Sequence, residues 1–437
     1  MSRNKHDRKR RILLGLLPLL ALAPSLAPHL DAQAAPAYWG DLRPGPHAVG
    51  YRLDYVRDPS RTAGLPPLGD RRQAAPLRLG PEQERVFPLR IWYPAAAGTG
   101  GATVRYGEYL GTRPDSGTAP AVADSLHART MDLVRFAARW YAAPTGAGRA
   151  PVAPGDTAGL AERLLASPAY AVRGPRPASG AFPVVVFAGG ASHSEDENVV
   201  LWEYLASHGY VVAAFPSVGV GRADLPATAG GLETQARDME AAIGYLDRVP
   251  FADRTRLAAM GFSFGGAAAL VTAGRNAWVD AVVGMDASFI ARRFDPVVRG
   301  APLFSPGRMR APLLEFHRAD STVSYAVVDS LGSATRYHVE FAGLFHIDFN
   351  SYALAYRAAL RGRTLARATA RDSALAVKGA AYRGMAVVTR EFLDAYVKGE
   401  NGAETRLRAM LAPGAPAWSG VPGDEVRFRS QPRAGGP

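Results

Sequence analysis

A serine between two glycines is the strongest candidate for chemistry in this sequence of 437 residues. Ser263 follows the apolar run 257–262 and precedes a stretch of small residues, which predicts a buried strand, a sharp turn and a tightly packed helix. Such a turn holds its serine in a strained backbone conformation with the hydroxyl exposed. Gly261 and Gly265 are needed because a Cβ at either position would collide with the neighbouring strand or helix. Ser263 is therefore a candidate nucleophile.

A serine hydroxyl needs a base to take its proton, and the base needs an acid to orient it. On a turn of this kind the chain order is serine, acid, histidine, so the search is restricted to residues after Ser263. His338 sits in the alternating run 337–341 and is expected to be a strand side chain, whereas His317 ends a strand and could approach the site. His346 lies in a loop just past the last expected strand, flanked by Gly343. We expect His346 to be the base.

Two aspartates compete for the role of the acid. Asp286 follows the expected strand 281–285, and Asp320 follows the expected strand 312–316. Both lie at carboxyl ends of strands, where open α/β sheets carry their chemistry. Position alone leaves Asp286 and Asp320 nearly even. The other one is expected to be an ordinary loop or helix-capping residue.

Two backbone N–H groups are expected to stabilise the negative charge that develops on the substrate oxygen. One is that of Phe264, directly after the nucleophile. The other comes from the glycine-containing loop 188–191, where alignment of Gly190 with the usual oxyanion glycine makes Ala191 the donor. We therefore expect an oxyanion site between Phe264 N and Ala191 N.

The elements that position these residues alternate regularly from about residue 182. A continuous apolar strand at 183–187 indicates a sheet that is covered on both faces. Further strands are expected at 86–93, 210–215, 256–260, 281–285, 312–316 and 335–341, and helices at 198–208, 233–248 and 387–398. This alternation predicts an α/β fold with a mostly parallel, eight-stranded sheet covered by helices.

The expected domain spans residues 35–412. Residues 95–180, with helical stretches at 121–141 and 161–165, are interpreted as a helical and loop insertion before the Val184–Phe187 strand, and as a possible cap. The Pro- and Gly-rich tail 413–437 is expected to be loosely ordered.

Residues 1–34 are expected to be a signal peptide. A basic segment precedes the apolar stretch 12–22, and Ala32-Gln33-Ala34 offers a cleavage site. The protein is thus expected to be exported, to the periplasm or the medium, by the Sec or the twin-arginine route, without a membrane span once the signal is removed. The chain has no cysteine, so no disulfide framework contributes to its stability.

Other ligands find little support in the sequence. The net charge of +12 comes from scattered arginines, which does not favour a nucleic-acid partner. The ladder Arg363, Arg367 and Arg371 is interpreted as a solvated helix face. The run from His193 to Glu197 is interpreted as a solvated loop and helix start rather than a metal site, and 219–221 lacks the context of a dinucleotide fingerprint. We expect no cofactor and no metal; the expected partner is a small-molecule or lipid ester, and the oligomeric state is left open.

Three segments together resemble bacterial members of the platelet-activating-factor acetylhydrolase family of the α/β-hydrolases: 261–266 around the serine, 284–287 around Asp286 and 345–349 around His346. Segments 45–50 and 91–94 resemble its early strands, so the similarity runs from about residue 45 to 400. The resemblance implies that Asp286 is the acid, whereas a dienelactone-hydrolase-like or cutinase-like interpretation favours Asp320. Gly189 departs from the family, which usually has histidine there.

These features lead to three hypotheses. The first is an exported serine esterase that cleaves short-acyl or phospholipid-type carboxylic esters through an acyl-enzyme with Ser263, His346 and Asp286. The second is a cutinase-type polyester depolymerase. The third, from another class, is a non-catalytic exported binding protein on a hydrolase scaffold.

Overall fold

The computed structural model describes residues 34–432 except 63–83, 111–119, 144–156, 158, 194, 220–223 and 361–367. The signal peptide expected at 1–34 therefore lies, but for its last residue, outside the described residues, as do Arg363, Arg367 and part of the 219–221 segment. None of the described helices is long and apolar enough to cross a membrane.

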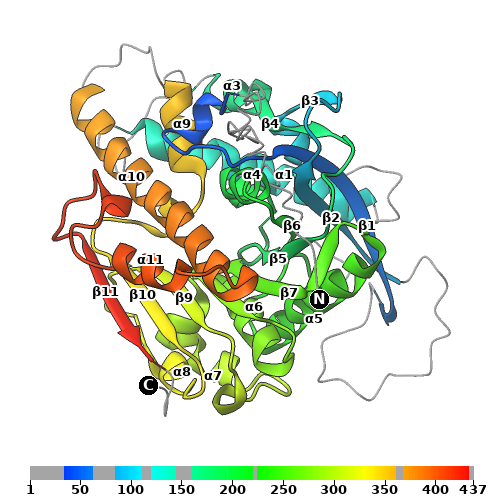
Figure 1. The fold of residues 1–437 in the computed structure, drawn as a ribbon, viewed down its shortest axis with the longest axis vertical. Coiled ribbons are helices and arrows are strands. Elements are labelled where there is room, and N and C mark those ends of the chain that lie inside the picture. Colours follow the sequence, from blue (N-terminus) through cyan, green and yellow to red (C-terminus); the bar gives the residue numbers. More distant parts are fainter. Residues whose placement is uncertain are drawn as a thin grey trace, which may run out of the picture. The chain divides into compact units, whose positions relative to one another are not determined.

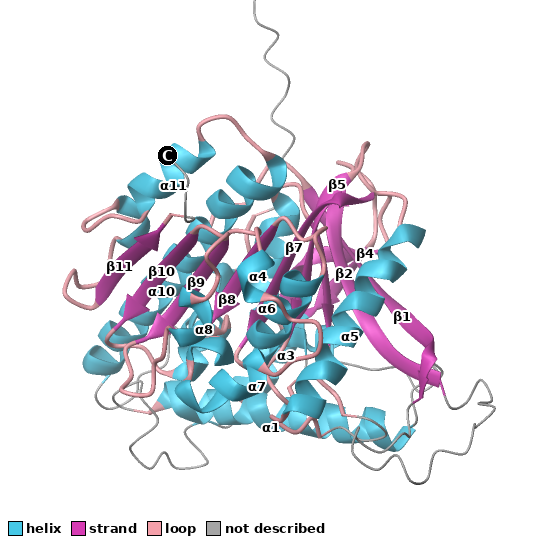
Figure 2. Cartoon of the chain, turned by 90° about the horizontal axis from the view of Figure 1, so that it is seen from below, coloured by secondary structure: helices cyan, strands magenta, loops and turns pink. Residues whose placement is uncertain are grey.

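The centre of the fold is one 11-stranded sheet with the strand order β11-β10-β9-β8-β7-β5-β6-β2-β1-β4-β3 (Figure 1). In chain order its members are β1 (Ala48–Thr62), β2 (Glu84–Ala95), β3 (Ala102–Arg105), β4 (Pro168–Arg173), β5 (Phe182–Ala188), β6 (Val211–Phe215), β7 (Ala252–Phe262), β8 (Ala281–Met285), β9 (Leu313–Arg318), β10 (Arg336–Phe341) and β11 (Val426–Gln431). From β6 to β10 every neighbouring pair is parallel, while β2 and β11 flank this block antiparallel. Figure 2 shows β11, β10, β9, β8 and β7 following one another across the sheet.

Helices cover both faces of the sheet. They are α1 (Pro120–Ala142), α3 (Leu160–Ala166), α4 (Val199–Ser207), α5 (Ala229–Tyr245), α6 (Phe264–Arg275), α7 (Asp295–Arg299), α8 (Ala326–Asp329), α9 (Tyr352–Leu360), α10 (Ala368–Leu393) and α11 (Ala403–Met410). Along β5, Val185 and Phe187 pack in the core with α1, α4, α9 and α10, whereas Val184 and Val186 pack in the core with α5 and α6. Because successive strand residues face opposite sides, the apolar run of β5 fills both cores.

The α/β architecture with a mostly parallel sheet is confirmed, but the expected eight strands were too few. The three additional strands lie at the edges, where β4 and β3 extend one side and β11 the other. The segment 95–180 is thus not only helix and loop, because β3 and β4 join the sheet. The tail 413–437 was expected to be loosely ordered, but its segment Val426–Gln431 forms a strand that pairs along the whole of β10. Its alternation of Val426 and Phe428 with arginines suits an edge strand with one covered face.

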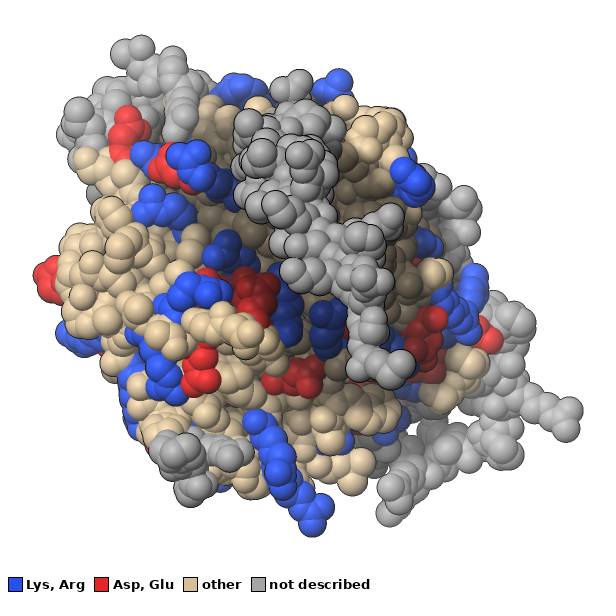
Figure 3. All heavy atoms as spheres, viewed as in Figure 1, with Lys and Arg blue, Asp and Glu red and all other residues tan. Residues whose placement is uncertain are grey.

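Lys and Arg lie among Asp and Glu across the face seen in Figure 3. This mixture agrees with the scattered arginines of the sequence, which form ion pairs both within one helix, such as Arg408–Glu404 on α11, and between distant elements, such as Arg275–Glu240.

Candidate active site

The turn that carries Ser263 joins β7 directly to α6. Its backbone has φ +54° and ψ −121°, a strained conformation for a residue with a side chain. A Cβ on Gly261 would lie 2.2 Å from the Gly265 carbonyl carbon, and a Cβ on Gly265 would lie 2.1 Å from the Ala188 oxygen. The expected strand, turn and helix and the need for both glycines are therefore confirmed.

His346 lies against this serine. Its Nε2 is 3.0 Å from Ser263 Oγ, and its ring stacks on Phe262 with centroids 4.5 Å apart. The other two candidate histidines are buried side chains of the sheet, and His317 contacts Tyr325 instead. Burial lowers the pKa of both, that of His338 to about 3. Of the three candidates, the structure thus brings only His346 to the serine.

Asp286 is the acid that meets His346. Its Oδ2 lies 2.5 Å from His346 Nδ1, so the imidazole donates through Nδ1 and is free to accept the Ser263 proton at Nε2. Asp286 has a φ of +44°, and its N–H donates to Phe316 O at 2.6 Å, which holds the residue at the end of β8. Asp320 instead accepts the Thr322 N–H in an exposed loop. Hydrogen bonds from Thr322 and then Arg318 lower the pKa of Asp320.

Arg318 is a member of the site that the sequence did not indicate. At the end of β9 its Nη1 lies 2.8 Å from Asp286 Oδ2, and its Nε lies 3.1 Å from Asp320 Oδ2. The only signal in the sequence was a cation at a strand end, two residues before a candidate acid. Arg318 reaches Asp286 because Met285 of β8 is paired with Phe316 of β9, so the ends of the two strands lie side by side.

A buried ion pair supports the turn that carries His346. The Asp348 carboxylate accepts the Phe345 N–H at 2.8 Å and the Tyr141 hydroxyl of α1 at 3.1 Å, and it pairs with Lys378 of α10. Burial raises the pKa of Asp348, although Lys378 opposes the shift. Tyr141 also places part of the 95–180 segment beside the base. The sequence carries no signal for the contacts of Tyr141 and Lys378 with Asp348, because these residues lie far from it in the chain.

The loop expected to supply an oxyanion donor is held by Glu197. This fully buried carboxylate accepts the Gly190 N–H at 3.0 Å through Oε2 and lies 2.6 Å from His193 Nδ1 through Oε1. Burial lowers the pKa of His193, but the Glu197 carboxylate outweighs it, so that the pKa is raised. The N–H groups of Phe264 and Ala191 donate no hydrogen bond within the described part of the chain, which leaves both free for a substrate oxygen.

The interpretation of residues 193–197 as a solvated loop was therefore wrong for Asp196 and Glu197, although a helix does start here, with Glu195–Asn198 leading into α4. Asp196 and Glu197 are both buried, and Asp196 accepts the hydroxyl of Tyr352. Burial raises the pKa of Asp196 to about 7. Among the described residues, no group of histidines and carboxylates could hold a metal ion.

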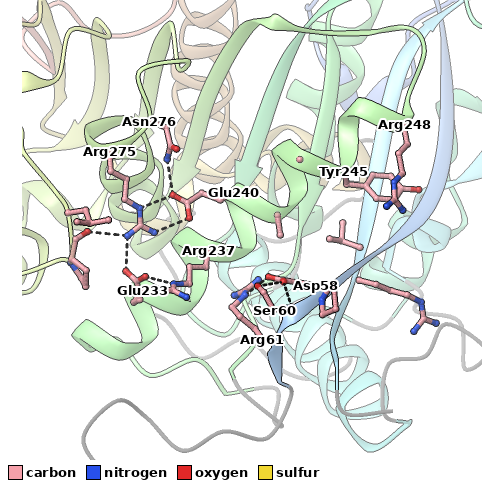
Figure 4. A pocket seen from close by; sticks show the side chains of 17 residues that line it. Asp58, Ser60, Arg61, Glu233, Arg237, Glu240, Tyr245, Arg248, Arg275 and Asn276 are labelled. Carbon is pink, nitrogen blue, oxygen red and sulfur yellow. Dashed lines mark hydrogen bonds and ion pairs between the residues drawn. The ribbon is translucent and has the colours of Figure 1, made fainter. Parts of the chain in front are cut away.

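A separate groove of about 520 Å³ lies between β1 and α5 (Figure 4). Its charges largely pair with one another, since Arg275 bridges Glu233 and Glu240 and Arg61 holds Asp58. None of the residues around Ser263 lines this groove, and its internal pairing leaves no obvious group for catalysis.

Comparisons with known proteins agree with this architecture. Residues 169–294 match the dienelactone hydrolase family, a stretch that includes Ser263 and Asp286 but ends before His346. The solved structure of a ferulic acid esterase from Streptomyces cinnamoneus superposes with a TM-score of 0.54 at 18% sequence identity, covering 87% of this chain and 96% of that chain. No curated protein matches the sequence. The chain therefore has the α/β-hydrolase fold and is similar to the dienelactone hydrolase family over the segment that carries the serine.

Proposed function

We propose that this protein is a serine hydrolase of carboxylic esters. The observation that carries the proposal is the continuous path from Ser263 Oγ to His346 Nε2 at 3.0 Å and from His346 Nδ1 to Asp286 Oδ2 at 2.5 Å. Both distances suit a nucleophile whose base is oriented by an acid. The similarity to the dienelactone hydrolase family supports the same class of reaction.

The chemistry follows from these contacts. Ser263 Oγ attacks the ester carbonyl carbon while His346 Nε2 takes the hydroxyl proton. The negative charge on the carbonyl oxygen is received by the N–H groups of Phe264 and Ala191. His346 then gives its proton to the departing alkoxide, which leaves an acyl group on Ser263. Water activated by the same imidazole releases the acid, while Asp286 stays ionised and holds the ring in place.

The substrate is proposed to be a short-acyl or phospholipid-type ester, in keeping with the acetylhydrolase-like segments around the triad. The ferulic acid esterase adds alkyl esters of aromatic acids, such as methyl ferulate, to the compounds worth testing. A screen of p-nitrophenyl esters of rising acyl length, a short-chain phospholipid and methyl ferulate would rank these classes by kcat/KM. Higher activity on a solid polyester film than on every soluble ester would favour a cutinase-type depolymerase instead.

The decisive experiment replaces the nucleophile. Ser263→Ala should abolish turnover of p-nitrophenyl acetate and labelling by a fluorophosphonate probe, while Ser60→Ala, at a serine that bonds to Asp58 in the separate groove, should keep both. Asp286→Asn should lower kcat by about 10⁴-fold through the wrong imidazole tautomer. Asp320→Asn should retain most of the activity. Full activity of Ser263→Ala would contradict the proposal, and a folded wild-type protein without labelling or turnover would favour a binding protein.

We also propose that the protein is exported, on the strength of its N-terminal sequence. Expression of the full chain in a bacterial host should yield a periplasmic or secreted product that begins near residue 35. If mass spectrometry finds the protein only in the cytoplasmic fraction and with an intact N-terminus, export is contradicted.

A further inference from the structure

Arg318 touches both aspartates that competed for the role of the acid. Its guanidinium contacts Asp286 through Nη1 at 2.8 Å and Asp320 through Nε at 3.1 Å, and its backbone N–H donates to Asp286 Oδ1 at 3.2 Å. We propose that Arg318 is a positioning residue for Asp286, and that Arg318 and Asp320 together set the pH range in which His346 acts as a base. The inference rests on the proposed ester hydrolysis.

The positioning role follows from a two-point hold. Asp286 Oδ1 accepts from the Arg318 backbone and Oδ2 accepts from its side chain, so rotation of the carboxylate is opposed at both oxygens. Oδ2 is also the oxygen that faces His346 Nδ1. The guanidinium therefore keeps the correct oxygen toward the imidazole, with a planar fork that a lysine lacks.

The charge of Arg318 acts on the same oxygen. A protonated His346 is stabilised by the Asp286 carboxylate, and the Arg318 cation offsets part of that negative charge. Arg318 is therefore expected to extend the pH range of activity towards acidic pH. Asp320 opposes this effect because its negative charge, next to Arg318 Nε, offsets part of the positive charge of Arg318. Both effects are moderate, since the Arg318 side chain is 32% exposed and partly screened by water.

Other ionisable groups packed around the site are neutral or paired. Glu315 of β9 is fully buried next to Asp286, and burial raises its pKa well above the usual value, which disfavours its charged form. Burial lowers the pKa of His317, which keeps that ring neutral as well.

Further charged groups lie on the other elements around His346. Asp348 is paired with Lys378 of α10, and His193 is paired with Glu197 in the oxyanion loop. Arg318 and Asp320 differ from these groups because Arg318 contacts the Asp286 carboxylate directly and Asp320 contacts Arg318.

The test is the pH dependence of kcat/KM for p-nitrophenyl acetate in five single variants. Arg318→Gln should move the acidic limb of the profile upward by about half a unit to one unit. Asp320→Asn should move it downward by a smaller amount. Arg318→Lys should keep the limb near its wild-type position but lower kcat, because the charge remains and the fork is lost. Arg408→Gln and Glu404→Gln, which remove the same charges from an exposed pair on α11, should leave the profile unchanged.

The double variant Arg318→Gln/Asp320→Asn provides the sharpest check. Because Asp320 acts mainly through Arg318, the double variant should resemble Arg318→Gln alone rather than the sum of two opposite shifts. Acidic limbs of Arg318→Gln and Asp320→Asn that coincide with the wild type, or that move in the same direction, would overturn the inference. Such a result with an active wild type and an inactive Ser263→Ala would leave the proposed function intact. Circular dichroism of each variant separates these shifts from unfolding, and Arg318→Lys keeps the test open if Arg318→Gln does not fold.

Discussion

Replacement of Lys378 by methionine should destabilise the protein strongly, because it removes the cation from a buried carboxylate. Asp348 is fully buried, and the Lys378 side chain is only 6% exposed. After the change the carboxylate keeps two neutral donors, the Phe345 N–H and the Tyr141 hydroxyl, and no counter-charge. Leaving one member of a buried pair alone costs about 3–5 kcal/mol.

The destabilisation should grow with pH. Burial already raises the pKa of Asp348 above its unfolded value, so the native state binds more protons than the unfolded state over the window between the two values. Stability contributed by the protonated form is present below the unfolded pKa, and it is lost as pH rises through the folded pKa. Loss of Lys378 raises the folded pKa of Asp348 further and extends this window upward. Each further unit by which the folded pKa of Asp348 is raised costs about 1.4 kcal/mol of stability at a pH above that pKa.

Urea unfolding followed by tryptophan fluorescence at pH 5 and pH 8 measures both effects, as a lower midpoint with an unchanged slope. Lys398→Met is a matched control, because its partner Asp394 retains Arg390 at 3.5 Å. The double variant Asp348→Asn/Lys378→Met should recover much of the loss, since no charge then remains buried. Turnover of folded Lys378→Met should fall by about ten- to a hundred-fold, because the turn that carries His346 is loosened.

A loss below about 1 kcal/mol at pH 8 would refute this account of the His346 turn. An equal loss at pH 5 and pH 8 would also contradict it, because the energy would then not come from the Asp348 charge.

Three further changes test other parts of the fold. Gly265→Ala should destabilise the protein by about 1–3 kcal/mol, because its Cβ would displace the Ala188 carbonyl next to the oxyanion loop. The kcat of the folded variant should fall as well. Gly244→Ala in α5, which has open space around it, is the control and should leave the free energy of unfolding in urea unchanged or raise it. Glu315→Gln should become more stable relative to the wild type as pH rises from 5 to 8, since a pKa of Glu315 that is raised in the native state makes the wild type lose stability when this carboxyl is deprotonated. A constant difference between the free energies of unfolding of the two proteins would contradict the raised pKa. Glu203→Gln should lower the free energy of unfolding by about 2–4 kcal/mol and lower the melting temperature as well. The two carboxylate oxygens accept hydrogen bonds from buried tyrosine, tryptophan and backbone donors, and the amide has only one oxygen to accept them. An unchanged transition would show that these donors find other partners.

Most parallel strands and their helices could be predicted because their signals are local. The apolar run of β5 and the alternation of strands and helices after it predict a doubly covered sheet, and β8 is found at the expected residues 281–285. The edge strands were harder. β3 has only four residues, and β11 lies in a segment rich in Pro and Gly, so their pairing depends on a neighbouring edge rather than on their own pattern.

The buried acids of the site show why burial is difficult to predict from one sequence. Glu197 lies in a short polar run, which is usually solvated, and Asp348 is a single carboxylate between Ile347 and Phe349. In the fold Glu197 meets His193 and Gly190 of its own loop, whereas Asp348 meets Lys378, which comes from α10. Carboxylates are buried where such donors meet them, and their meeting is decided by packing.

The sequence by itself determined the turn at Ser263 and the loop position of His346. Both depend on local rules, namely the steric demand for glycine beside a strained serine and the place of the base after the last parallel strand. Only the tertiary structure decided that Asp286, and not Asp320, lies against the imidazole, with Arg318 between the two acids. The physical reason is strand register: β8 and β9 are paired side by side, so the residues after Met285 and Phe316 meet at one edge of the sheet.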